Sequence, residues 1–211
     1  MRLSSKVVNQ LKPIIFLLLI LPSIYWGINF IDYWGINFIG QNLGANPIDR
    51  LMDEFGQMSL RLIILTLLVS SLSEINFFRA LSNIRRMIGL FAFYYVCLHF
   101  LTYIVLDHFF NWQFILKDVI KRPFITFGFI SFVLLIPLAV TSINVLVKKL
   151  GFKIWKRIHM LIYIVALLAS LHYFLLTKAD KTEPLIYLFI ILLLLFWRLY
   201  SRRLKFFFNH H

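Results

Sequence analysis

Residues 158–176 read IHMLIYIVALLASLHYFLL, an uninterrupted apolar run that holds two histidines. An α-helix rises about 1.5 Å per residue, so this run is nearly long enough to cross the roughly 30 Å of hydrocarbon in a bilayer. His159 and His172 would lie roughly 20 Å apart along the helix axis, one near each membrane face. Imidazole is a good ligand for iron, and an ionisable side chain held in hydrocarbon indicates a functional site. We therefore predict that both histidines bind haem iron.

The composition excludes an ordinary soluble domain. Of 211 residues, 61% are hydrophobic and only 15% are charged, and the mean hydropathy is +0.83. The apolar runs are continuous and do not alternate with a period of two, which excludes an outer-membrane barrel. We predict an all-α, polytopic membrane protein with haem bound between its helices. The net charge of +13 reflects short basic clusters between spans, so we expect membrane lipid and not nucleic acid as the partner of these charges.

Six membrane spans fit the sequence, at roughly 13–31, 59–77, 87–106, 124–144, 158–176 and 185–200. The basic residues give their direction, because cytoplasmic loops are enriched in Lys and Arg. A cytoplasmic N-terminus places most of the 22 Lys and Arg residues on the inner side. The outer side then receives only Arg50, Arg61, Lys117, Lys121, Arg122, Lys178 and Lys181. We therefore expect both termini in the cytoplasm.

Four features of the chain carry little functional information. The basic lead before residue 13 resembles that of a signal sequence, but the apolar stretch is long and no small-x-small site follows, so we expect a retained first helix. Cys97 is the sole cysteine. The segment Tyr25–Ile31 recurs as Tyr33–Ile39, which we interpret as a short tandem duplication. His210 and His211 receive no chemical role, and the sequence does not distinguish native residues from a tag there.

The histidines of the third and fifth spans fall at matching depths. Arg85 and His99 are fourteen residues apart, which is nearly a whole number of turns, so both lie on one helix face. Because His99 and His172 lie at the same depth in the membrane, we pair them around an outer haem. His159 is then left for an inner haem. Thirteen residues in an ideal helix, however, leave His159 and His172 about 140° apart in azimuth. A bend, a π-bulge or two laterally offset haems would resolve this conflict.

The second ligand of the inner haem is left open by these residues. The position could be vacant, filled by water or approached by Arg85, although a protonated guanidinium is a poor ligand. Pairing with a haem propionate, or anchoring at the inner face, suits Arg85 and Arg86 better. Each histidine could also simply bond a neighbouring helix, and we expect His108 to be an exposed loop residue. Phe93, three tyrosines and two glycines could contact porphyrin, or they could pack helices: Tyr103, Tyr163, Tyr173, Gly89 and Gly128.

Five motifs together resemble the MsrQ family, formerly YedZ, within the ferric-reductase-like transmembrane group. They are Arg85-Arg-Met-Ile-Gly-Leu90, Leu98-His-Phe-Leu-Thr-Tyr103, Lys121-Arg-Pro-Phe-Ile-Thr-Phe-Gly128, Trp155-Lys-Arg-Ile-His159 and His172-Tyr173. The family consists of haem-binding membrane subunits of periplasmic methionine sulfoxide reductase systems. The resemblance covers nearly the whole chain, which we expect to form one domain over residues 1–211. The Tyr-Trp repeat departs from the family pattern.

The resemblance implies a specific role in electron transfer. It implies a six-helix bundle in the bacterial inner membrane that binds one or two b-type haems and, as the family is described, FMN. Electrons would pass from the quinone pool, or from a cytosolic flavin reductase, to the periplasmic molybdopterin subunit MsrP, which repairs oxidised methionine. His99, His159 and His172 match the family's haem-ligand positions, and Arg85 matches an arginine proposed to assist the second haem.

Two other functions remain open at this stage. A ferric or quinone reductase of the same fold would act without MsrP. A small transporter or structural subunit would also have six spans, but it would be colourless. Because no phosphate loop, paired cysteine or nucleophile elbow occurs in the sequence, we predict an electron-transfer subunit and not a complete enzyme.

Overall fold

A computed structural model describes residues 4–32 and 43–208, with side chains up to Ser201 in the last helix. Its elements in chain order are α1 (Ser5–Ile31), α2 (Pro47–Leu72), the 3₁₀ helix η2 (Asn76–Leu81), α3 (Ser82–Leu101), the π-helical turn η3 (Thr102–Asp107), α4 (Trp112–Lys121), α5 (Pro123–Val140), α6 (Asn144–His159), α7 (Leu161–Leu176) and α8 (Thr182–Phe208). These residues contain no strand, which confirms the all-α prediction. The second copy of the repeat, Tyr33–Ile39, lies outside them, as do Arg2, His210 and His211.

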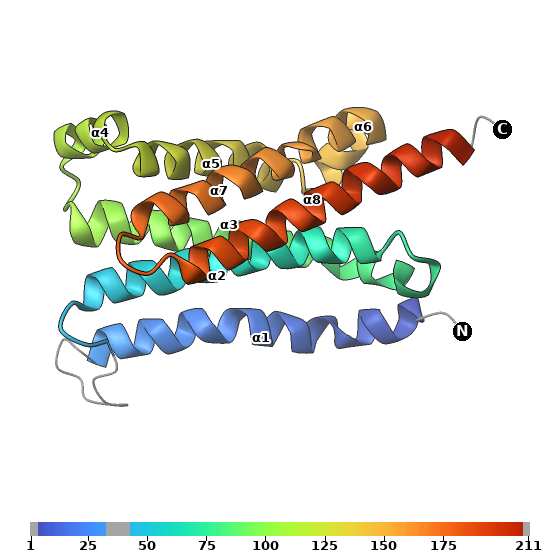
Figure 1. Cartoon of the computed structure of the whole chain (residues 1–211). Coiled ribbons are helices and arrows are strands. Elements are labelled where there is room, and N and C mark those ends of the chain that lie inside the picture. Colours follow the sequence, from blue (N-terminus) through green and yellow to red (C-terminus); the bar gives the residue numbers. More distant parts are fainter. Residues whose placement is uncertain (1–3, 33–42, 209–211) are drawn as a thin grey trace.

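The predicted number of spans is confirmed for the described part of the chain. Six of its helical segments are long and apolar enough to cross a membrane. They run side by side, and α1 begins at the same end of the bundle at which α8 ends (Figure 1). We call this end the terminal end, and the end that carries α4 the distal end. The shared position of the two helix ends agrees with the predicted topology.

The predicted second span, 59–77, was wrong at both ends. Helix α2 begins at Pro47, where Asn46 accepts the Asp49 N–H as an N-cap and proline occupies the first turn. Asp49, Asp53 and Glu54 lower the hydropathy of residues 47–58, so the sequence pattern did not indicate a helix there. Arg61 lies within α2 and donates to the Tyr187 hydroxyl of α8 at 2.8 Å.

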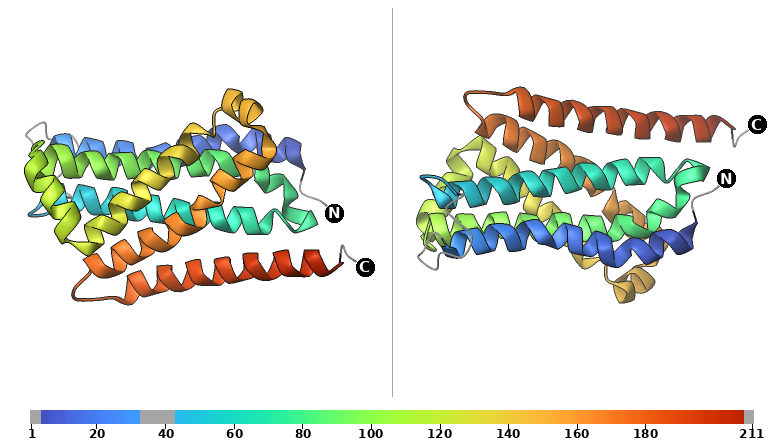
Figure 2. Two further views of the ribbon diagram at one scale, coloured as in Figure 1. Left: turned by 90° about the horizontal axis from the view of Figure 1, so that it is seen from above. Right: turned by 90° about the horizontal axis from the view of Figure 1, so that it is seen from below.

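Two closely packed helix pairs form the centre of the bundle, α2 with α3 and α5 with α7. Helix α8 packs on α7 and α2, and α1 packs mainly on α3. The views from above and below show α1 and α8 at the margins (Figure 2). The core contains Ile63, Tyr95, Val165 and Ile191, each at most 1% exposed. The two central pairs are therefore the frame on which any buried site depends.

The fifth span is broken between its two histidines. His159 ends α6, and α7 begins at Leu161 after a turn at Met160. Helix α6 is itself kinked at Gly151, whose φ of 74° suits glycine. The predicted span at 158–176 lies within one helical segment, Asn144–Leu176, that is interrupted at Met160. The interruption lies where the predicted bend between the two histidines would be needed.

A tyrosine hydroxyl bonds to two backbone groups in the middle of α1. The Tyr95 hydroxyl of α3 accepts from Ser23 N at 3.2 Å and donates to Leu19 O at 2.7 Å. Pro22, which lacks an N–H, lies beside these groups and weakens the helix hydrogen bonding locally. Tyr95 therefore joins α3 to α1 through two buried backbone groups.

Tyr95→Phe should destabilise the protein by about 1–3 kcal/mol, because it leaves Ser23 N–H and Leu19 C=O without the hydroxyl that satisfies both. The measurement is loss of helical circular dichroism in mild detergent as a denaturing detergent is added. Tyr200→Phe is the control, since Tyr200 is 53% exposed. Equal stability of the two variants would show that the hydroxyl contributes nothing to the packing of α1.

Candidate functional site

His99 of α3 and His172 of α7 face each other across the seam between the two central helix pairs. Their ring centroids are 6.1 Å apart and their planes are nearly perpendicular, at 80°. Both rings line one cavity of about 80 Å³, together with Asp53, Gln57 and Tyr173. The structure thus brings together the two histidines that depth alone had paired.

Each of these imidazoles is held by a backbone carbonyl. His99 Nδ1 lies 2.8 Å from Met52 O of α2, and His172 Nδ1 lies 2.6 Å from Phe124 O of α5. A carbonyl oxygen can only accept, so Nδ1 must carry the proton in both rings. The Nε2 lone pair of each ring is left available. This is the arrangement that fixes the tautomer of a metal-binding histidine.

A glycine makes room for each ring. Gly56 follows Met52 by one helical turn, and Gly128 follows Phe124 in the same way. A Cβ added at Gly56 would lie 3.0 Å from His99 Nδ1, and one at Gly128 would lie 2.8 Å from His172 Nδ1. Any larger residue would push the ring away from its carbonyl. The same carbonyl–glycine clamp is therefore built twice, once in each central helix pair.

His159 lies in a second and larger cavity toward the terminal end. This cavity has a volume of about 440 Å³. His159 Nδ1 is 3.0 Å from Trp155 O, and its Nε2 has only a long contact, 3.4 Å, with the Ser142 hydroxyl. The Trp155 ring centroid is 4.1 Å from that of the imidazole. Among the residues that the structure describes, no second histidine lines this cavity, so His159 differs from the distal pair.

Three arginines line the His159 cavity. Arg85 and Arg86 come from α3, and Arg198 comes from α8. Arg85 Nη1 is 3.4 Å from the Ser70 hydroxyl, and Arg86 donates to Asn144 Oδ1. The cavity wall is therefore strongly positive, which suits an anionic group on a bound molecule.

Arg198 is fixed by three elements at once. It forms an ion pair with Glu74, donates to the Tyr163 hydroxyl at 3.2 Å and donates to Ser70 O at 3.1 Å. Both charged side chains are largely buried, at 17% and 20% exposed. The pair thus closes one side of the cavity by joining α8 to α2 and α7.

The two cavities are neighbours along the bundle. Ile63 of α2 and Leu135 of α5 line both of them. Helix α3 contributes Arg85 to one cavity and His99 to the other, in agreement with the predicted shared face. The side chains that could hold bound groups are therefore distributed over two adjacent compartments.

The remaining residues singled out from sequence fall into two groups. Phe93 and Tyr163 line the larger cavity, and Tyr173 lines the smaller one, where its hydroxyl donates to Glu183 at 3.0 Å. Tyr103 lies outside both cavities, in ring contact with His108. His108 was expected to be an exposed loop residue. This was wrong, because its side chain is only 13% exposed and contacts Asp107 and Asp118.

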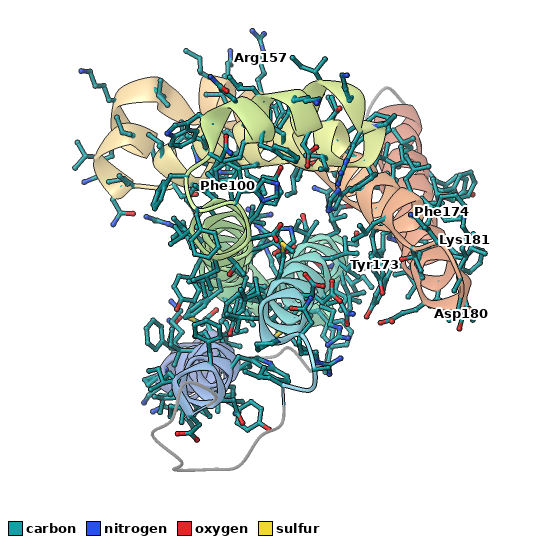
Figure 3. The ribbon with its side chains drawn as sticks, turned by 90° about the vertical axis from the view of Figure 1, so that its left-hand side faces the viewer. Phe100, Arg157, Tyr173, Phe174, Asp180 and Lys181 are labelled. Atoms are coloured by element: carbon teal, nitrogen blue, oxygen red, sulfur yellow. The ribbon has the colours of Figure 1, made fainter. Side chains whose placement is uncertain are left out.

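The distal end of the bundle is shown in Figure 3, which looks along the helices. Phe100 lies on the side of α3 that faces α5, where its ring contacts Phe132. Lys181 and Phe174 lie at the α7–α8 turn, with the ammonium 4.3 Å from the ring centroid. In this turn, outside the spans, the hydrogen bond from Thr182 lowers the pKa of Asp180.

Sequence reasoning missed Gly56, the two carbonyl partners, and the Glu74–Arg198 pair. Gly56 would carry a signal only once α2 is known to begin at Pro47, because a glycine inside a helix costs roughly 1 kcal/mol relative to alanine and so suggests a packing role. The carbonyl of Met52 carries no signal, since every residue has one. Its role depends on how α2 and α3 align.

Comparison with known proteins gives a consistent result. Residues 55–170 match the family model described as ferric reductase like transmembrane component. A protein of Caulobacter vibrioides is 47% identical over 76% of this chain and 77% of its own length. One of Herminiimonas arsenicoxydans is 47% identical over 75% and 73%, and one of Rhodospirillum rubrum is 42% identical over 88% and 85%. All three are named protein-methionine-sulfoxide reductase heme-binding subunit MsrQ.

Gly128→Ala should destabilise the chain by about 1–3 kcal/mol, because its methyl group collides with the His172 ring. Gly89→Ala is the matched control. A Cβ there meets only Thr66, at 3.8 Å, and alanine is the better helix former by roughly 0.5–1 kcal/mol. Detergent unfolding of both variants measures the difference. If Gly128→Ala were as stable as Gly89→Ala, the clamp on His172 would not be tight.

Proposed function

The chain belongs to the family of ferric reductase like transmembrane components and, within it, to the MsrQ family, and from this premise we propose that it is a haem b subunit that carries electrons across the bacterial inner membrane. The proposed acceptor is the periplasmic methionine sulfoxide reductase MsrP. The proposed donor is the quinone pool or a cytosolic flavin reductase. In this role the chain is an electron-transfer subunit whose whole length, residues 1–211, acts as one domain.

The distal histidine pair is the observation that supports haem most strongly. Imidazole–metal bonds are about 2.0 Å long, so two rings on opposite sides of one metal ion have nitrogens about 4 Å apart and centroids about 6 Å apart. The measured centroid separation is 6.1 Å. We therefore propose that His99 and His172 would hold the iron of one haem.

The number of metal-binding side chains near the distal histidines favours haem over a bare metal ion. Within residues 4–32 and 43–208, no group of three or more His, Cys, Asp or Glu side chains is arranged to hold a metal. Two imidazoles alone leave a metal ion short of ligands, because a bare protein-bound ion usually takes four or more. A porphyrin brings four nitrogens of its own. Bound haem supplies one-electron redox chemistry, and the axial imidazoles tune its potential.

His159 and Arg85 would serve a second haem in the larger cavity. His159 offers the one imidazole there, and Arg85 lines the same space. We propose His159 as an axial ligand and Arg85 as the partner of a haem propionate, because a guanidinium stays protonated and pairs well with carboxylates. FMN is proposed from family resemblance only, and we assign it no residues.

The proposed topology places the terminal end in the cytoplasm. Most Lys and Arg residues near helix ends lie there, including Arg85, Arg86 and Arg157. The distal end would then face the periplasm and offer a docking region for MsrP. Electrons would enter near His159 and leave near His99 and His172.

His172→Ala should remove the distal haem, because only His99 would remain to hold it. A pyridine haemochrome assay together with a protein determination gives haem per chain, and the reduced spectrum shows which haem is lost. His108→Ala is the control, since His108 lies outside both cavities. Unchanged haem content and spectrum in His172→Ala would reject the ligand assignment.

Methionine sulfoxide reduction should require both this chain and MsrP. Membranes that contain the chain, supplied with a reduced quinone and purified MsrP, should reduce a sulfoxide-bearing protein. The His99→Ala chain should lower this rate to the level of membranes without the chain. If the chain reduced ferric iron or quinone but supported no sulfoxide reduction with MsrP present, a ferric or quinone reductase that acts alone would be favoured instead.

A further inference from the structure

Helix α4 lies across the distal end of the bundle and not along it (Figures 2 and 3). Its inner side is tied to the protein, with Ile115 and Asp118 buried. Asp118 pairs with Arg122 at 3.3 Å, and the Thr126 hydroxyl of α5 donates to Val119 O at 2.5 Å. Because the six long helices follow the membrane normal, a helix across their ends lies in the membrane plane.

The outer side of α4 carries an apolar stripe. Trp112, Leu116 and Ile120 are four residues apart, so they share one helix face. They are 57%, 61% and 80% exposed. Phe109 and Phe110, in the turn just before α4, are also exposed and adopt positive φ. A contiguous row of exposed aromatic and aliphatic side chains is rare on a surface that contacts only water and indicates an interaction site.

A basic stripe runs beside the apolar one. Gln113, Lys117 and Lys121 are again four residues apart and are all exposed. Such a helix, with an apolar face next to lysines, has the composition of helices that bind at the surface of a bilayer. The lysines match the charge of phospholipid headgroups.

We propose that α4 is an interfacial helix whose apolar stripe inserts into the leaflet at the distal end while its lysines contact anionic headgroups. Lipid is the favoured occupant because α4 lies in the membrane plane and its charge complements phosphate. Helix α4 is also continuous with a lipid-exposed surface, since α5, on which α4 packs, carries exposed apolar side chains such as Ile130 and Val133. The proposal rests on the membrane span assignment and not on haem binding.

The anchor would set the depth of the distal site. Only Arg122 separates α4 from α5. Phe124, which follows immediately, supplies the carbonyl that holds His172. An α4 fixed at the interface therefore holds the start of α5, and with it the His172 clamp, at a constant height in the bilayer.

The test measures which solvent each stripe contacts. The full chain with Cys97→Ser carries either Ile120→Cys or Lys121→Cys, two positions about 100° apart around the helix axis. Each variant is labelled with a small fluorophore and is reconstituted in phosphatidylcholine vesicles with phosphatidylglycerol. Nitroxide-labelled lipid should quench the label at 120 about fivefold more than the label at 121, because interfacial helices insert their apolar face by only about 5–10 Å. Aqueous iodide should show the reverse order.

Two results would overturn the proposal. Strong iodide quenching at 120 would mean that the stripe faces water. Quenching at 120 by neither agent would mean that protein, such as a second copy of the chain, covers the stripe. Helical circular dichroism of both labelled variants shows whether the chain folds, and a haem determination on the same samples tests the proposed function separately.

Discussion

The distal site depends on one hydrogen bond that is made twice, between a histidine Nδ1–H and a main-chain carbonyl. Met52 O holds His99 and Phe124 O holds His172. Both bonds require a glycine one turn later, because a side chain there would displace the ring. With Nδ1 occupied, each ring presents Nε2, and the separation of the rings then fits a shared metal. Helix packing therefore decides the chemistry of both imidazoles.

The larger cavity, which contains His159, is instead lined by charged side chains. Its arginines are held by specific partners, with Arg198 bound to Glu74, Tyr163 and Ser70. A buried ion pair is tolerated when hydrogen bonds satisfy the remaining groups, and here the Tyr163 hydroxyl and the Ser70 carbonyl do so. Arg85 has a long contact with Ser70 alone among side-chain bonds, so it keeps donors for a bound anion. The two compartments thus offer different means of holding a cofactor.

Much of this arrangement could be predicted from the sequence. The number of spans follows from apolar length, and the pairing of His99 with His172 follows from matching depth. The start of α2 could not be predicted, because Asp53 and Glu54 make the first half of a spanning helix look like a loop. A bend between His159 and His172 could be predicted, but its position at Met160 could not, since no proline or glycine marks it. The role of Gly56 became clear only when α2 and α3 were aligned.

The carbonyl–glycine clamp has a consequence for how a large flat molecule enters a closely packed helical bundle. Each ring is oriented by its own helix pair, His99 by α2 and α3 and His172 by α5 and α7. Parting the two pairs would open a slot without unwinding a helix or releasing either imidazole. A molecule bound in that slot would join two preassembled halves of the bundle. Its binding would therefore complete the assembly and strengthen the packing of the two halves in one step.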